Sequence, residues 1–83
     1  MLEEIKRFRQ LLGRQLRKTR QQYGLSIEDV AGHVDTGADH LGRIERGERQ
    51  PTAYTFAKLC DYLGLDSHVL LEIMDELKQH RAD

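Results

Sequence analysis

A chain of 83 residues has room for one domain with a modest core and not for a second. Helix-forming Leu, Arg, Glu, Lys and Gln dominate, and β-branched residues never alternate over a useful stretch, so the composition favours helices and argues against a sheet. The net charge is −1 at pH 7, and no apolar run approaches the roughly 20 residues that span a bilayer.

The charge is unevenly distributed along the chain. Residues 1–20 hold seven Lys or Arg against two Glu, so this segment carries +5 and the remaining chain carries −6. A basic end of this kind could face an anionic partner such as a phosphate backbone. A solvated, charged helix face is the alternative interpretation of the same residues.

The first predicted helix spans about residues 2–23. Gly24 is a good stop, because glycine accepts the left-handed conformation that ends helices. Gly13 interrupts the pattern; a helix can absorb one glycine at roughly 1 kcal/mol relative to alanine, or it can bend or break there. The apolar stripe of this helix recurs at helical spacing and consists of Leu2, Ile5, Phe8, Leu12, Leu16 and Tyr23.

Two short helices follow. Ser26, with Asp29 three residues later, predicts the N-cap of a helix that runs to about Val34. A tight turn over residues 35–37 separates it from a third helix over about residues 38–46. Two short helices joined in this way are typical of a helix-turn-helix, although many helical bundles contain such a pair.

Two further helices are expected towards the C-terminus. Thr52 can cap a helix over residues 53–63, and Ser67, or Asp66 before it, can cap a last helix that runs to about Gln79. The apolar stripe of the last helix consists of Val69, Leu70, Ile73, Met74 and Leu77.

These stripes at the two ends of the chain raise the possibility of association. A domain of this size needs only part of the two stripes to complete its own core, so we expect a symmetric homodimer. The stripe of the last helix is the preferred interface because it is longer than that of residues 1–11. The alternative is that the two stripes pack against each other within one monomer.

The residues from about Leu12 to Leu65 resemble the phage-repressor, or Xre-like, helix-turn-helix family of transcriptional regulators. The matching pieces are, in order, residues 16–20 (LRKTR), 23–26 (YGLS), 30–31 (VA), 41–47 (LGRIERG), 49–52 (RQPT) and 59–65 (LCDYLGL). Each piece is common, but their order and spacing together are specific. The resemblance implies an all-α, five-helix, lambda-repressor-like domain over residues 1–83, with 1–11 as an extension and about 66–79 as a C-terminal helix.

The resemblance also implies sequence-specific binding of double-stranded DNA, with the third helix in the major groove. The positions implied to read bases are Ala38, Asp39, His40 and Arg43, and those implied to hold the backbone are Ser26, Arg46, Arg49 and Gln50. It further implies an ion pair between Arg20 and Glu45. Arg43 has the chemistry to bind guanine O6 and N7 bidentately, although an exposed arginine paired with Asp39 four residues earlier is the alternative.

Three residues depart from the family pattern. Ile27 replaces the usual glutamine, Asp35 replaces a glycine in the turn, and Gly42 replaces a common serine within the third helix. Aspartate tolerates left-handed geometry better than most residues, so the turn can survive. With the net acidity and the poor base-reading residues, these departures keep a second hypothesis open: a protein-interaction module on the same scaffold.

An enzyme is disfavoured, and we expect no cofactor, metal, small-molecule substrate or membrane partner. The histidines, His33, His40, His68 and His80, show no metal-ligand spacing. The single cysteine, Cys60, cannot form a disulfide within the chain, which fits a reducing compartment. No signal peptide is visible because the N-terminus is charged within four residues, and we therefore expect a cytoplasmic protein.

Overall fold

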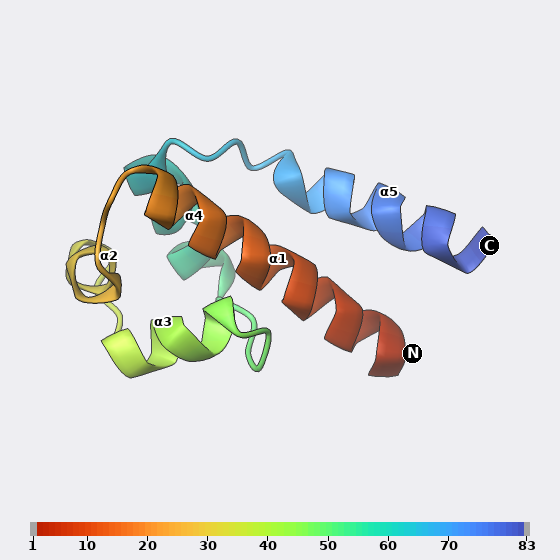
Figure 1. Cartoon of the computed structure of the whole chain (residues 1–83), viewed down its shortest axis with the longest axis horizontal. Coiled ribbons are helices and arrows are strands. Elements are labelled where there is room, and N and C mark those ends of the chain that lie inside the picture. The colour runs from red at the N-terminus through yellow and green to blue at the C-terminus, as the bar shows by residue number, and fades with distance from the viewer. Residues whose placement is uncertain (1, 83) are drawn as a thin grey trace.

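The structure, a computed structural model, describes residues 2–82, and side-chain surroundings for residues 2–80 (Figure 1). This part of the chain folds into helices alone, as the sequence predicts. The helices are α1 (Leu2–Gln22), α2 (Ile27–His33), α3 (Ala38–Glu45), α4 (Ala53–Leu63) and α5 (Val69–Ala82). Of the predicted ends, only that of α5 differs by more than one residue, because this helix continues to Ala82. No helix of the described residues is both long and apolar enough to cross a membrane.

The long helix α1 is the element around which the others are arranged. Figure 1 shows α5 running beside α1, while α2, α3 and α4 gather around the C-terminal half of α1. α1 packs against both α3 and α5, and α2 packs against α3 and α4. α2 and α3 are the two short helices predicted from the sequence. α3 packs directly on α1, and α2 is connected to α1 through α3.

One continuous core joins all five helices. The largest fully buried side chains come from the first four helices and from Val34, which directly follows α2; those in the helices are Leu16, Val30, Leu41, Ile44 and Leu59. The inward stripe of α5 extends this core, since Val69, Ile73 and Leu77 are between 4% and 6% exposed. These three residues of the predicted dimer stripe are thus buried within the monomer. Leu70 and Met74 are half-buried at the edge of the core.

Side chains at the N-terminal ends of the helices satisfy backbone groups as predicted. Ser26 Oγ accepts a hydrogen bond of 3.0 Å from the Asp29 N–H, and Thr52 Oγ1 accepts one of 3.1 Å from the Thr55 N–H. Ahead of α5, Asp66 Oδ1 accepts from the His68 N–H at 2.8 Å, so Asp66 rather than Ser67 provides the acceptor there.

The predicted stripe of α1 was wrong at both ends. Leu2 is 83% exposed, and Tyr23 is 62% exposed. Leu2 opens the helix at the end of the chain, and Tyr23 lies in the turn after α1, so neither side chain faces the core. The buried part of the stripe is centred on Leu12 and Leu16.

Gly13 does not bend or break α1, which passes through it as a continuous helix. It is buried where the end of α3 meets α1. A Cβ atom at this position would stand 2.5 Å from the Ile44 carbonyl oxygen and closer still to that of Glu45. Gly13 is therefore required by the close approach of two helices, since only a residue without a side chain admits the α3 backbone there.

Replacing Gly13 with alanine tests this packing. Gly13→Ala is expected to lower the free energy of unfolding by about 1–3 kcal/mol, the usual cost of overpacking, even though alanine is the better helix former. Gly32→Ala is the matched control, because Gly32 is also helical but a Cβ there would meet nothing within 4 Å. The control should gain up to about 1 kcal/mol. Urea unfolding measures both, and equal stability of the two variants would contradict the packing argument.

Candidate nucleic-acid interface

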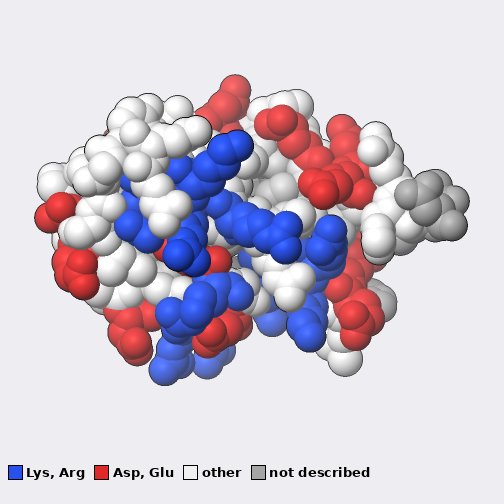
Figure 2. Space-filling view, viewed as in Figure 1, with Lys and Arg blue, Asp and Glu red and all other residues white. Residues whose placement is uncertain are grey.

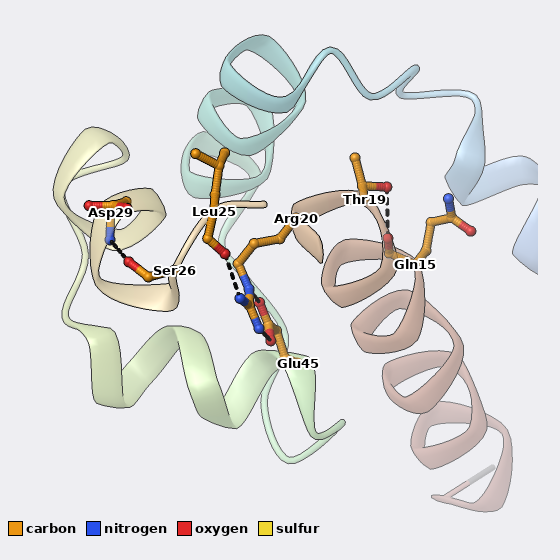
Figure 3. Close-up of polar contacts among 7 residues, drawn as sticks. All are labelled: Gln15, Thr19, Arg20, Leu25, Ser26, Asp29 and Glu45. Carbon is orange, nitrogen blue, oxygen red and sulfur yellow. Dashed lines mark hydrogen bonds and ion pairs between the residues drawn. The ribbon is translucent and has the colours of Figure 1, made fainter. Parts of the chain in front are cut away.

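The most elaborate polar contact of the described residues joins α1 to α3 through Arg20 (Figure 3). Arg20 Nε donates to Glu45 Oε2 at 2.7 Å, and Nη2 donates to Glu45 Oε1 at 3.0 Å. The third nitrogen, Nη1, donates to the carbonyl oxygen of Leu25 at 2.8 Å. We call this set of contacts the Arg20 clasp.

The clasp lies largely out of solvent. The side chains of Arg20 and Glu45 are only 13% and 6% exposed. The hydrogen bond that Arg20 donates to Glu45 raises the pKa of Arg20, against the opposing effect of burial. The clasp connects the end of α1, the loop before α2 and the last turn of α3. It therefore holds the C-terminal end of α3 against α1.

A lysine of α4 stabilises the turn between α2 and α3. Asp35 adopts a positive φ of 53°, the left-handed conformation that the sequence suggested for it. Its carboxylate accepts a hydrogen bond of 2.9 Å from Lys58 Nζ, which also lies 5.2 Å from the centre of the Tyr54 ring. The Lys58 ammonium lowers the pKa of Asp35 through this hydrogen bond. A stacked pair, His33 on Tyr62 with ring centres 4.3 Å apart, adds a second contact between α2 and α4.

The outward face of α3 carries the residues implied to read bases. Leu41 and Ile44 point into the core, which leaves Asp39, His40 and Arg43 exposed and Ala38 half-buried. Arg43 Nη2 lies 3.6 Å from Asp39 Oδ2, and the two side chains are 46% and 86% exposed. The in-chain pair foreseen as the alternative for Arg43 is therefore present, but exposed pairs of this kind contribute little and leave the arginine free to move.

Two of the departures from the family pattern lie together in the structure. A Cβ atom on Gly42 would stand 3.5 Å from Ile27 Cδ1 and 3.1 Å from Arg46 Nη1. Gly42 thus leaves room for the Arg46 guanidinium over the side of α3, next to the start of α2. This contact between Gly42, Ile27 and Arg46 could not be predicted from the sequence, because it depends on how α2 and α3 cross.

The segment after α3 contains an acid that the sequence analysis missed. Arg46 Nε donates to Glu48 Oε2 at 2.7 Å, and this exposed pair raises the pKa of Arg46 and lowers that of Glu48. Arg49 is exposed, and it has no ionic partner among the described side chains. Gln50 is also exposed, and it lines an apolar hollow of about 190 Å³ with Phe8 and Met74.

Comparison with known proteins agrees with this geometry. The sequence profile of the helix-turn-helix domain matches residues 11–73, so the chain belongs to the helix-turn-helix family. The resemblance seen in the sequence is confirmed, and this family is a class of binding proteins rather than of enzymes.

Relatives in sequence and a solved structure show which individual proteins this chain is similar to. It is 37% identical over 57 residues to the HTH-type transcriptional regulator DdrOP3 of Deinococcus deserti, covering 69% of this chain and 44% of that protein. It is 36% identical over 63 residues to the uncharacterized HTH-type transcriptional regulator y4dJ of Sinorhizobium fredii, covering 76% of this chain and 80% of that one. The crystal structure of the clp gene regulator ClgR from Corynebacterium glutamicum superposes with a TM-score of 0.75 at 26% identity, covering 90% of this chain and 81% of that one.

A double-mutant cycle tests the energetic weight of the Arg20 clasp. Glu45→Gln leaves the Arg20 charge without its partner, and we expect a loss of about 3 kcal/mol, the low end for a buried pair because Arg20 keeps some solvent contact. The coupling between Arg20→Gln and Glu45→Gln should lie between about 0.5 and 3 kcal/mol.

The exposed pair of Arg46 and Glu48 is the matched control for this cycle. Each glutamine substitution there should change the free energy of unfolding by about 0.5 kcal/mol at most, with coupling below about 1 kcal/mol. Denaturant unfolding of all the variants gives both couplings. No coupling between Arg20 and Glu45 would show that the clasp does not hold the fold together.

Proposed function

We propose that this chain is a transcriptional regulator that binds double-stranded DNA in a sequence-specific way by inserting α3 into the major groove. The observation that carries the proposal is the outward face of α3, which is exposed while its inner face is held by the Arg20 clasp and Gly13. A recognition helix must be both accessible and rigidly placed to read base edges. The names of the similar regulators support the same function, and DNA as the partner supports a cytoplasmic location.

The proposed division of roles follows side-chain chemistry. Arg43 can bind guanine O6 and N7, Asp39 can accept from cytosine N4, and Ala38 can contact a thymine methyl. His40 flanks them on the exposed side of α3. Residues proposed to hold the phosphate backbone are Ser26, Arg46, Arg49 and Gln50. Of these, Arg49 carries an unpaired charge, whereas Arg46 has to exchange Glu48 for a phosphate.

A protein-interaction module remains the second candidate function. It is favoured by the acids that already engage Arg43 and Arg46, because a surface with paired charges attracts DNA less strongly. Binding of random duplexes at low salt separates the two functions, since non-specific affinity comes from phosphate contacts and falls steeply with salt.

Substitution of Arg43 tests the proposed reading of bases. Arg43→Ala should cost about 1–3 kcal/mol on the preferred duplex and relax the preference at one base pair. Arg49→Ala should instead weaken all sequences alike and reduce the slope of log K against log salt by about 1. Selection from a random duplex library, followed by titration of each variant, measures both effects. Unchanged affinity and preference in Arg43→Ala would contradict the assignment.

We also propose that the chain forms a symmetric homodimer. One short helix makes few base contacts, whereas two recognition helices about 34–36 Å apart can read both halves of a palindromic site. Since Val69, Ile73 and Leu77 are used inside the monomer, the surface left for a partner is the adjoining apolar surface of α1 and α5. Ile5, Phe8 and Met74 line one hollow of this surface and Leu70 lines the next, and Leu71 continues it on the outer side of α5; Leu71 is 58% and Ile5 39% exposed.

Sedimentation as a function of concentration tests the dimer. The wild type should approach twice the monomer mass of 9.7 kDa at micromolar concentration. Leu71→Gln, at the most exposed position of the apolar surface, should shift the equilibrium towards monomer without loss of fold. Tyr23→Gln is the matched control, because Tyr23 is a similarly exposed large side chain, at 62%, in the turn after α1. A wild type that stays monomeric as concentration rises would remove the dimer.

A further inference from the structure

Seven of the described cations form two groups that differ in their partners. Around the proposed reading surface, each of four cations lies within 4 Å of an acid of the same chain: Arg20 with Glu45, Arg43 with Asp39, Arg46 with Glu48 and Lys58 with Asp35. On the outward face of α1, by contrast, Arg14, Arg17 and Lys18 are exposed and have no ionic partner among the described side chains. Arg43 and Arg46 are thus paired, whereas Arg49 and the three α1 cations form no ion pair within 4 Å.

These three residues form what we call the α1 basic surface. Gly13 is the point at which the end of α3 meets α1, and Arg17 lies one helical turn after it on the same side of α1, so Arg17 brings the surface next to the C-terminal end of α3, while Arg14 and Lys18 extend it towards α5. Figure 2 shows blue side chains along the middle of α1 and continuing down to the region of α3 on the same face of the molecule. The surface is thus continuous with the proposed DNA-binding side.

An acidic wall borders the α1 basic surface on its other side. Arg14 and Lys18 line one side of a hollow of about 410 Å³ between α1 and α5, and the opposite side carries Asp66, Glu72 and Glu76. In Figure 2 the red side chains at the upper right lie over α5. Because like charges repel, a polyanion meeting this face is directed away from α5 and towards α3.

We infer that the α1 basic surface is a second contact for the phosphate backbone of double-stranded DNA, and that it supplies sequence-independent affinity while α3 supplies preference. The inference rests on the proposed DNA-binding function. Phosphate contacts position a protein on a duplex without reading its sequence, and each one releases condensed counterions. Free cations serve this purpose better than the paired arginines of α3, since no internal ion pair has to break first.

The occupant is a duplex rather than an acidic protein because of where the surface lies. An acidic partner protein could use an isolated basic patch, but the basic side chains of α1 share a face of the molecule with those in the region of α3 (Figure 2). A second copy of this chain, presenting the acidic side of α5, is the protein that the charges would otherwise fit.

The test removes charge while keeping helix propensity. The triple variant Arg14→Gln, Arg17→Gln, Lys18→Gln should bind the preferred duplex with a salt slope smaller by about 2–3, at roughly 0.9 for each lost contact. Its ranking of duplex sequences should stay that of the wild type. Lys78→Gln, which removes one exposed charge from α5, is the control and should leave the slope unchanged. Fluorescence titrations between about 50 and 200 mM salt provide the slopes, and circular dichroism checks the fold.

The outcomes separate this inference from the proposed function. Arg43→Ala should lose sequence preference and keep the residual, salt-dependent binding that the triple variant loses. A triple variant with the wild-type slope would overturn the inference while leaving base reading by α3 intact. A triple variant that keeps its slope but loses salt-sensitive self-association without DNA would also overturn it, in favour of the α5 side of a second copy.

Discussion

The position of the recognition helix depends on one guanidinium group. The planar guanidinium of Arg20 donates to both carboxylate oxygens of Glu45 and to the Leu25 carbonyl, so one side chain connects the end of α1, the loop that follows it and the last turn of α3. A lysine could not replace it, because a single ammonium does not match a carboxylate bidentately and reach a third acceptor in one plane. Lys58, which makes one hydrogen bond to Asp35, serves a simpler purpose: it holds a turn.

The contact at Gly13 explains why the clasp and the basic face of α1 occur together. Since the end of α3 meets the α1 backbone at Gly13, Arg17, one helical turn later, stands next to the C-terminal end of α3, the helix that we propose to face DNA. The chain thus separates two tasks that a small domain has to combine. In the proposed mode of binding, the paired arginines on and just after α3 supply selectivity, while the α1 cations, which form no ion pair, supply attraction that is independent of sequence.

Local signals in the sequence were enough for the helices and most of their ends. Ser26, Thr52 and the glycines after α1 and α4 act within one turn of the chain, so their effect can be predicted without tertiary structure. The pairing of Arg20 with Glu45 came from family resemblance, since nothing local links residues 25 positions apart. For Gly13 the sequence predicts either an absorbed glycine or a bend or break of α1. The need for glycine comes from the α3 backbone, which packs against this position and is distant in the sequence. Likewise, the partition of the α5 stripe between the monomer core and the surface depends on how α5 docks on α1, which spacing alone does not fix.

The central claim is that α3, held by the Arg20 clasp, faces the DNA together with the neighbouring surface of α1. Amide chemical shifts measured by NMR during titration with a duplex selected from a random library test this most directly. The account predicts the largest shift changes over residues 38–50, with a second set around Arg14, Arg17 and Lys18, and small changes along the outer side of α5. Changes confined to α5 or α4, with residues 38–46 unaffected at saturation, would contradict it.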